Sequence, residues 1–367
     1  MLTAFGHRSV RNAAMPFTPD YRHLAAVMRN ERPARLPLYE HLVNPESMER
    51  VLNTGFAELG RSNKPEDLDE FFRHYCRFFR EMTYDTVSFE VCIGGVLPDG
   101  GAIRGGKAGP IQNRADYERY PFDELPEAFA RHAWPRFDAL RRAMPEGMKA
   151  VGGVGNGPFE ISENLVGLEY LPLMQVDDPE LYRDLFDRIG RLMETVWSQF
   201  LERYADLFVA CRFGDDLGFK SSLLTNPTTV RERLVPQYRR VIEKVHAAGK
   251  PFLWHSCGNI FEVMEDFIAL GIDVKHSNED AIAPFDEWLD KYKDRIAIVG
   301  GFDMHFLCTA SEQEVYERVF EEGKRFRAKA NGYALGSGNS IPKYVPLENY
   351  LAMVRAARAI REGEGAA

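Results

Sequence analysis

Short apolar segments alternate with longer amphipathic segments along most of this chain of 367 residues, and this alternation restricts the fold more than any other feature. Most of the short segments are bounded by Gly, Asp or Asn, as expected for parallel strands buried on both faces. Eight such strands with helices between them predict an α/β fold, a closed (β/α)8 barrel in place of an open doubly wound sheet. The candidate strands are residues 36–41, 85–90, 149–154, 207–213, 251–257, 272–276, 296–301 and 333–336.

The helical segments have an apolar residue at every third or fourth position. Between Leu181 and Tyr204 this spacing continues over several turns. The segment after Asn226-Pro227 begins with a capping residue and a first-turn proline, and a last helix is expected after Pro346. We therefore expect a single barrel domain over residues 31–361, with an N-terminal extension at 1–30 that adds helices and a flexible tail at 362–367.

Composition restricts the class of function. The formal net charge of −9 argues against a nucleic-acid partner, which would require a basic face. No apolar run approaches the ~20 residues that cross a bilayer, and the first 30 residues lack the apolar core of a secretory signal. The five cysteines are widely spaced and odd in number, which fits a reducing compartment. We expect a soluble cytoplasmic protein that acts on a small molecule.

Polar and titratable residues follow the candidate strands, where the chemistry of such barrels is located. Any one of them is more readily explained as a loop cap or a solvated acid. Together they are expected to meet in one pocket, because burying so many acids and imidazoles is unfavourable without a ligand. In strand order these residues are Glu40, His41, Glu90, Asn156, Glu160, Asp215, Asp216, His255, Cys257, His276, Asn278, Glu279, Asp303, His305, Ser337 and Asn339.

The segment Trp254-His255-Ser256-Cys257 places an imidazole and a thiol two residues apart at a strand end. Residues two apart on a strand point to the same face, so both can bind one zinc ion. A packed thiol beside a hydrogen-bonded ring is an equally good reading of the motif. Zinc requires at least one further ligand, and no candidate has diagnostic spacing: these are Glu90, Glu160, Asp215, His276 and His305.

The neighbouring carboxylates Asp215 and Asp216 follow the fourth strand and cannot both face the same way. We expect one of them to face the pocket and the other to cap the loop. The chain has neither a dinucleotide-binding fingerprint nor a P-loop, so no nucleotide cofactor is expected.

The order of these motifs resembles the uroporphyrinogen decarboxylase superfamily over roughly residues 36–358. The resemblance is carried by Gly-Pro-Phe-Glu at 157–160, Gly-Asp-Asp-Leu-Gly at 214–218, His-Ser-Cys-Gly-Asn at 255–259, Gly-Gly-Phe-Asp at 300–303 and Gly-Ser-Gly-Asn at 336–339. It implies a (β/α)8 barrel, frequently a homodimer, with the active site at the barrel mouth.

The superfamily contains two chemistries. Its porphyrinogen decarboxylases hold substrate carboxylates with an arginine-bearing N-terminal motif, whereas this chain has Glu40 and His41 there. Its cobamide-linked methyltransferases bind zinc through H-x-C and a distant cysteine. His255 and Cys257 match the first two ligands, but Ser337 stands near the position of the third. The resemblance is therefore closer to the methyltransferase branch.

The hypothesis we favour is a zinc-assisted methyltransferase that acts on a small methylated compound, with a corrinoid protein as a partner and the corrinoid borne by that partner. The alternatives are a decarboxylase, with Asp215 or His255 as proton donor, and a barrel that binds without catalysis. Under the favoured hypothesis His255 and Cys257 bind the metal, and the remaining residues divide into catalytic candidates (Glu90, Glu160, Asp215, His276) and substrate-binding candidates (Glu40, His41, Asn156, Asp216, Asn259, Asp303, Ser337, Asn339).

Overall fold

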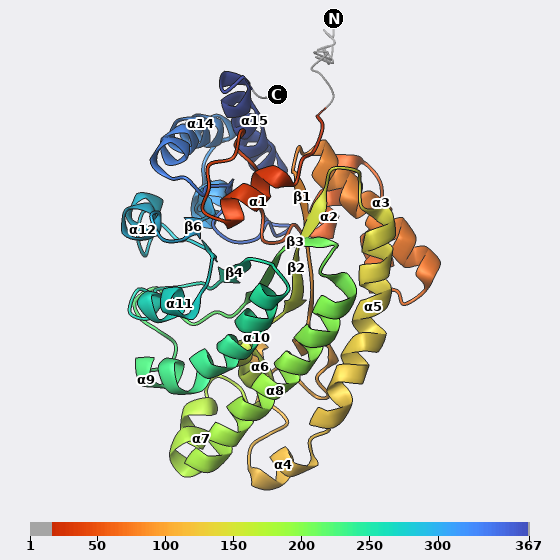
Figure 1. Cartoon of the computed structure of the whole chain (residues 1–367), viewed down its shortest axis with the longest axis vertical. Coiled ribbons are helices and arrows are strands. Elements are labelled where there is room, and N and C mark those ends of the chain that lie inside the picture. The colour runs from red at the N-terminus through yellow and green to blue at the C-terminus, as the bar shows by residue number, and fades with distance from the viewer. Residues whose placement is uncertain (1–16, 366–367) are drawn as a thin grey trace, which may run out of the picture.

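The computed structural model describes residues 17–365 of the chain, and these fold into a (β/α)8 barrel (Figure 1). Strands β1 to β6 pair in chain order and all are parallel, as the alternation of strand and helix predicts. The strands are β1 (Thr86–Cys92), β2 (Lys149–Gly155), β3 (Phe208–Gly214), β4 (Phe252–His255), β5 (Val274–His276), β6 (Ala297–Ile298), β7 (Gly300–Phe302) and β8 (Leu335–Ser337).

The ring closes through β6, β7 and the segment before α2. Val299, between β6 and β7, donates its N–H to Lys275 of β5, and Gly300 donates to Ala334 on the other side. Strands β6 and β7 therefore occupy one strand position, the predicted strand 296–301. The first predicted strand, 36–41, forms a parallel bridge between Leu38 and Leu335. Among the described residues, no ladder of backbone hydrogen bonds joins that segment to β1. A side chain makes the connection instead: the Ser88 hydroxyl of β1 donates to the His41 carbonyl at 2.5 Å.

The helices lie outside the ring and begin where the sequence places their caps. Asn226 accepts the N–H of Thr229, and the helix predicted from residue 181 begins at Pro179 with Asp178 as its cap. The helices are α1 (Arg22–Met28), α2 (Pro45–Leu52), α3 (Pro65–Glu81), α4 (Arg114–Arg119), α5 (Leu125–Ala143), α6 (Pro158–Leu165), α7 (Leu171–Asp177), α8 (Pro179–Tyr204), α9 (Pro227–Thr229), α10 (Val235–Ala247), α11 (Met264–Leu270), α12 (Phe285–Tyr292), α13 (Met304–Thr309), α14 (Glu312–Lys329) and α15 (Leu347–Gly363).

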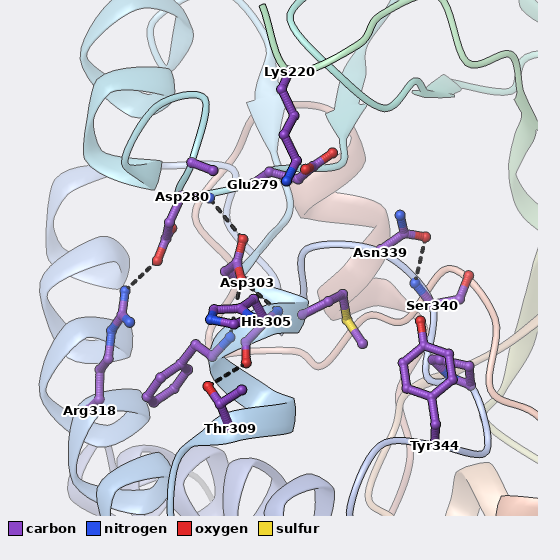
Figure 2. Close-up of a pocket in the computed structure, with 14 residues that line it drawn as sticks. Lys220, Glu279, Asp280, Asp303, His305, Thr309, Arg318, Asn339, Ser340 and Tyr344 are labelled. Atoms are coloured by element: carbon purple, nitrogen blue, oxygen red, sulfur yellow. Dashed lines mark hydrogen bonds and ion pairs between the residues drawn. The ribbon is translucent and has the colours of Figure 1, made fainter.

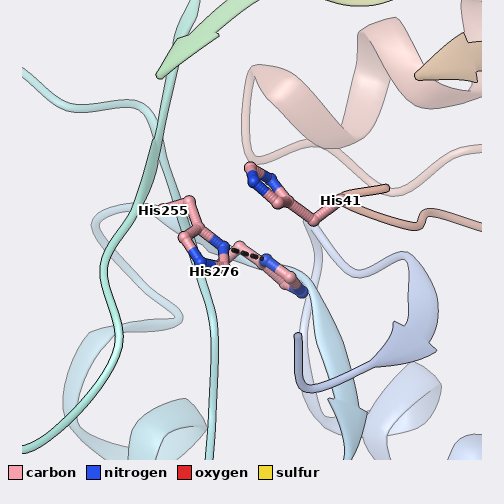
Figure 3. A group of neighbouring side chains, drawn as sticks. All are labelled: His41, His255 and His276. Carbon is pink, nitrogen blue, oxygen red and sulfur yellow. Dashed lines mark hydrogen bonds between the residues drawn. The ribbon is translucent and has the colours of Figure 1, made fainter. Parts of the chain in front are cut away.

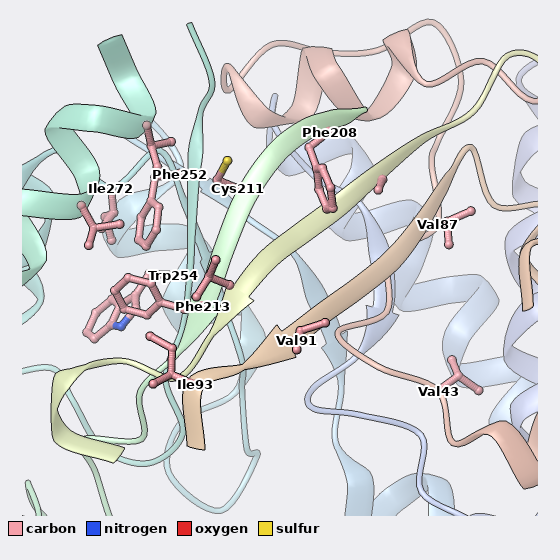
Figure 4. Packing of buried hydrophobic residues seen from close by; sticks show 14 of the residues in the cluster. Val43, Val87, Val91, Ile93, Phe208, Cys211, Phe213, Phe252, Trp254 and Ile272 are labelled. Atoms are coloured by element: carbon pink, nitrogen blue, oxygen red, sulfur yellow. The ribbon is translucent and has the colours of Figure 1, made fainter. Parts of the chain in front are cut away.

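The core has two parts because successive residues on a strand point to opposite faces. Outward residues such as Phe213 and Trp254 pack under the helices, where Trp254 stacks on Phe267 with ring centroids 3.8 Å apart (Figure 4). Inward residues such as Leu253 form a second cluster inside the barrel. This alternation places His255 on the inward face of β4, directly after the outward Trp254.

Helix α1 closes one end of the barrel. Leu24 and Val27 are completely buried and belong to the same cluster as Val151, Leu253 and Val274 of the barrel interior. Figure 1 shows α1 at the end of the barrel away from α4 and α7. Part of the predicted N-terminal extension is thus a plug on which the barrel interior packs, and residues 1–16 of that extension lie outside the described residues.

At the C-terminus, α15 continues to Gly363, inside the segment expected to be a tail. The Glu364 carboxylate accepts the N–H of Leu36 at 3.0 Å and pairs with Arg327 at 2.9 Å. The chain therefore remains fixed to the barrel three residues past the predicted end of the domain, at Glu364, and residues 366–367 lie outside the described part. Across residues 17–365, none of the helices has the length and apolar character needed to cross a membrane.

Candidate functional site at the barrel mouth

The predicted metal ligands His255 and Cys257 lie beside each other at the end of β4. The His255 Nε2 atom is 3.5 Å from the Cys257 sulfur, and both residues face the barrel mouth. The Asp216 carboxylate, from the end of β3, lies 3.8 Å from the same nitrogen and accepts the Cys257 N–H at 2.9 Å. Nitrogen, sulfur and oxygen donor atoms of these three residues all lie within 4.8 Å of one another.

A hydrogen-bonded relay determines which nitrogen of His255 carries a proton. His276 Nε2 lies 3.0 Å from the Ser337 carbonyl, which can only accept, so this nitrogen must be protonated. Burial lowers the pKa of His276 to about 3, so the ring is neutral and its Nδ1 is an acceptor. That Nδ1 lies 2.8 Å from His255 Nδ1, which must therefore donate (Figure 3). As a result, His255 Nε2 presents an unprotonated lone pair to Cys257 and Asp216.

His41 completes a buried cluster of three imidazoles but does not extend the ligand set. Its ring stacks on that of His255, with centroids 3.9 Å apart and planes 17° from parallel (Figure 3). Imidazole lone pairs lie in the ring plane, so two stacked rings cannot direct them at one ion. His276 is also occupied at both nitrogens. Burial lowers the pKa of His41 and His255 well below the usual value, so all three rings are neutral.

Ser337, which stands near the position of the third zinc ligand in the methyltransferases, directs its hydroxyl to Glu40 and not to Cys257. Its hydroxyl donates to Glu40 Oε2 at 2.5 Å, and its N–H donates to Oε1 of the same carboxyl. Glu40 is 1% exposed, and burial raises its pKa to about 8. The side chain that reaches the thiol from this loop is Asn339, whose amide nitrogen is 3.2 Å from the sulfur. Ser337 and Glu40 therefore join the first and last strand positions below the mouth.

The two neighbouring carboxylates divide as predicted, and the structure decides which is which. Asp215 is fully buried and accepts the backbone N–H groups of Phe159 and Glu160 together with the Tyr238 hydroxyl, at 3.2, 2.8 and 2.6 Å. These bonds place its carboxyl at the N-terminus of α6, where the hydrogen bonds and the helix dipole favour an anion, whereas burial outweighs them and raises its pKa to about 7. Asp216 is 43% exposed and faces the mouth. Of the two carboxylates, Asp215 is therefore the one that caps a helix, and Asp216 is the one that is open to the mouth.

Glu90 is held by a cation inside the barrel that the sequence interpretation did not single out. Arg212 of β3 is completely buried and donates from Nε and a terminal nitrogen to Glu90 Oε2, at 3.0 and 2.8 Å. It also donates to Tyr39 and Ser88. This buried ion pair, reinforced by the bonds from Arg212 to Tyr39 and Ser88, holds Glu90 Oε2 in place and makes the carboxylate less available as a base or ligand. Arg212 could have been recognised in the sequence as the only charged residue of the apolar segment 207–213, since a charge in a buried strand requires a partner.

Lys275 of β5 is a second buried cation that the sequence did not single out, because the predicted strand 272–276 also contains Asp273 and His276. It is 1% exposed, lies over the Trp288 ring at 4.0 Å and donates to the Ser277 carbonyl. Burial lowers its pKa to about 7. Because β5 alternates, Lys275 points away from the barrel interior while His276 points into it.

Glu160 stands at the mouth with a carboxyl whose pKa is raised. Burial, together with the charges of Asp215 and Asp216, raises its pKa well above the usual value. Asn156, in a left-handed conformation with φ of 67°, donates to Glu160 Oε2 at 2.6 Å. Gly214 lies between these groups and the imidazoles: a Cβ on it would stand 3.4 Å from His255 and 3.9 Å from Glu160. The predicted convergence of acids and imidazoles at the strand ends is thus present for Glu160 and His255.

A cavity of about 910 Å³ opens beside this group of residues, lined by loops after β5, β7 and β8 and by Lys220 (Figure 2). Asn339 borders both the cavity and the Cys257 thiol. Asp303 and His305 line the cavity as well. The Asp303 carboxylate, however, accepts the N–H groups that begin α13 and the backbone N–H of Asp280. The last candidate, Asn259, lies in a turn where its N–H donates to the Phe219 carbonyl.

The fold and the mouth define a (β/α)8 barrel protein with an imidazole, a thiol and acidic groups at the carboxyl ends of its strands. Residues 107–360 match the family described as uroporphyrinogen decarboxylase (URO-D), and the chain belongs to this family. The match covers most of the barrel, including β3, β4 and the residues around Cys257.

Solved structures with the same fold include a methyltransferase from Methanosarcina mazei. It superposes with a TM-score of 0.67 at 16% identity, over 92% of this chain and 97% of the other. A glycoside hydrolase family 5 enzyme from Prevotella bryantii B14 matches with a TM-score of 0.44 at 10% identity, over 78% of this chain and 86% of the other. No curated protein matches the chain significantly. At 16% identity, the similarity to the methyltransferase structure shows a shared fold and nothing further.

Proposed function

We propose that this protein is a metal-assisted methyltransferase that acts on a small methylated compound, with His255 and Cys257 holding a zinc ion. The observation that carries the proposal is the 3.5 Å separation of His255 Nε2 and Cys257 Sγ. In a tetrahedral site with Zn–N of about 2.1 Å and Zn–S of about 2.3 Å, those two atoms stand about 3.6 Å apart. The shared fold with the methyltransferase from Methanosarcina mazei supports the same reading.

The groups around the two residues fit a bound metal. His276 holds the other ring nitrogen of His255, and zinc-binding imidazoles are commonly oriented in this way. Burial raises the pKa of the Cys257 thiol, and a bound cation would favour the thiolate. A zinc ion in this position would act as a Lewis acid toward a thiol or a methylated heteroatom.

Other residues at the mouth have roles that follow from their protonation and contacts. Burial and the neighbouring acids raise the pKa of Glu160, which favours the protonated carboxyl that can donate a proton to the heteroatom that loses the methyl group. Asn156 orients that carboxyl through its amide at 2.6 Å. Asp215 serves as a positioning residue, because it holds the first turn of the helix that carries Glu160.

The cavity beside Asn339 is the place proposed for the substrate. Its volume of about 910 Å³ is ample for a small organic molecule. Its lining combines Lys220 and Glu279 with apolar side chains such as Phe306. A methyl acceptor borne by a corrinoid protein is part of this proposal, and such a partner would approach at the open mouth.

The test combines metal analysis with methyl transfer. Protein purified without chelators should contain about one zinc per chain, and Cys257→Ala should lose it, whereas Cys76→Ala, a buried cysteine of α3, should retain it. A set of methylated alcohols, amines, phenols and thioethers is then incubated with free cob(I)alamin, and methylcobalamin formation is followed by absorbance. Protein that cannot be loaded with any divalent metal would contradict the proposal.

Decarboxylation is the competing reaction because of the family to which the chain belongs. Incubation with uroporphyrinogen, scored by loss of carboxyl groups, tests it directly. Arg212 reaches the barrel interior, but its charge is already balanced by Glu90 at 2.8 Å, so it offers little attraction to a polyanionic substrate. Turnover of uroporphyrinogen would replace the methyltransferase proposal with this alternative.

A further inference from the structure

The metal site proposed above has two ligands from one strand end and needs a third. The candidates from the sequence were Glu90, Glu160, Asp215, His276 and His305, and four of them are engaged elsewhere. Glu90 pairs with Arg212, Asp215 caps α6, His276 is bonded at both nitrogens and Glu160 Oε2 accepts the Asn156 amide at 2.6 Å. The fifth, His305, lies at the start of α13 beside the neighbouring cavity.

We infer that Asp216 is the third ligand, so that the protein binds its metal through one nitrogen, one sulfur and one oxygen atom. Asp216 Oδ1 lies 3.8 Å from His255 Nε2, close to the roughly 3.4 Å that separates nitrogen and oxygen ligands of one tetrahedral zinc ion. The inference rests on the proposed function, because it completes the metal site named there.

The backbone holds this carboxylate in place before any metal binds. The Cys257 N–H donates to Asp216 Oδ1 at 2.9 Å, which couples the loop after β3 to the loop after β4. The Asp215 N–H donates to the His255 carbonyl at 3.0 Å and continues the pairing of the two strands past their ends. Gly218 and Gly258 pack so closely that a Cβ on Gly258 would stand too near the Gly218 backbone. Both loops are therefore fixed relative to each other, and with them the three donor atoms.

A second observation points to a ligand at this place. His255 is 5% exposed, and the relay through His276 leaves its Nε2 unprotonated. Its polar neighbours there are the Cys257 sulfur and the Asp216 carboxylate, both of which are ligand groups. A buried lone pair that faces a thiol and a carboxylate is suited to a cation. The remaining positions on the ion would face the mouth, open to a substrate atom.

The ligand chemistry predicts which metals the site accepts. Replacing a thiolate by a carboxylate makes a site harder, and an imidazole, a thiolate and a carboxylate together suit borderline divalent cations such as Zn²⁺ or Co²⁺. With a single thiolate, the site should also be less biased toward soft ions than one that contains two. Asp216 thereby supplies the third ligand that Ser337 does not, since the Ser337 hydroxyl is hydrogen-bonded to Glu40.

The experiment uses Co²⁺ as a spectroscopic probe and Zn²⁺ for affinity. Metal is removed from the full chain with a chelator, and Co²⁺ is titrated into wild type, Asp216→Asn, Asp216→Cys and the control Glu262→Gln, an exposed acid of the loop after β4. Wild type and control should bind one Co²⁺ with the same thiolate-to-cobalt absorption. Asp216→Asn should weaken Zn²⁺ binding in chelator competition by more than the about 10–100-fold that loss of an outer hydrogen-bonding partner causes. Asp216→Cys should raise the thiolate absorption about twofold.

The outcomes separate this inference from the function on which it rests. If wild type binds Co²⁺ through a thiolate and both Asp216 variants match it in spectrum and affinity, another group is the third ligand while the metal-assisted function stands. If wild type binds no metal, the proposed function itself fails. Circular dichroism of each variant shows whether it is folded, and because Asp216→Cys is expected to gain a signal, unfolding cannot imitate that result.

Discussion

His255 and His276 share a hydrogen bond between their Nδ1 atoms, which lie 2.8 Å apart at the carboxyl ends of adjacent strands β4 and β5. The two residues are direct partners in the parallel register, so strand pairing itself brings the rings together. The bond leaves one nitrogen of His255 free to face Cys257. It makes the protonation of a candidate metal ligand depend on a neighbour that touches neither the thiol nor the carboxylate.

Loss of this bond should weaken metal binding without unfolding the barrel. In His276→Gln the amide can still donate to the Ser337 carbonyl, but it no longer imposes the Nδ1-protonated form of His255. We expect Zn²⁺ affinity to fall about 10–100-fold in chelator competition. Long-range proton–nitrogen NMR of the metal-free wild type should show His255 protonated at Nδ1. A signal from the Nε2-protonated form would contradict the relay.

Arg212→Met should strongly destabilise the protein, because it leaves the Glu90 carboxylate buried with its charge unbalanced. Breaking a buried pair in this way costs about 3–5 kcal/mol of unfolding free energy. The surface pair Arg141–Asp206, with side chains 40% and 68% exposed, is the control, and Arg141→Met should cost less than about 1 kcal/mol. Urea denaturation measures both. The double variant Arg212→Met with Glu90→Gln should recover part of the loss, and no recovery would argue against the pairing.

The buried Glu40 carboxyl should make stability fall as the pH rises. Its ordinary pKa is 4.5, and burial raises the folded pKa to about 8. Below pH 4.5 both folded and unfolded chains hold the proton and the contribution is full. Between about pH 5 and 8 the unfolded chain releases the proton while the folded chain keeps it, so unfolding becomes progressively easier. Glu40→Gln should reduce this decline by an amount on the order of a few kcal/mol. Urea denaturation at pH 5 and pH 8 measures the decline in unfolding free energy, and an equal decline in wild type and variant would refute the prediction.

The α1 plug should contribute to stability as a core helix does. Leu24 is completely buried against the barrel interior, so Leu24→Ala should lower the unfolding free energy by about 2–5 kcal/mol. Leu173 of α7, which is 57% exposed, provides the matched control, and Leu173→Ala should change stability by less than about 0.5 kcal/mol. Similar effects from both substitutions would mean that residues 22–28 are an appendage to the barrel.

The periods of strand and helix in the sequence are sufficient to predict the barrel. They also predicted His255 and Cys257 on one face, and the two side chains do lie together, although β4 ends at His255 and Cys257 stands in the loop that follows. The division of labour between Asp215 and Asp216 was also predictable in kind, because neighbouring residues of an extended segment diverge.

Only the tertiary structure decided which residues meet. Asp215 caps α6 and Asp216 reaches Cys257 because of how two loops pack, which no local pattern records. Arg212 pairs with Glu90 across 122 positions of sequence. Side-chain direction follows from local backbone geometry, whereas hydrogen-bond partners and pKa values depend on distances between segments that are remote in the chain.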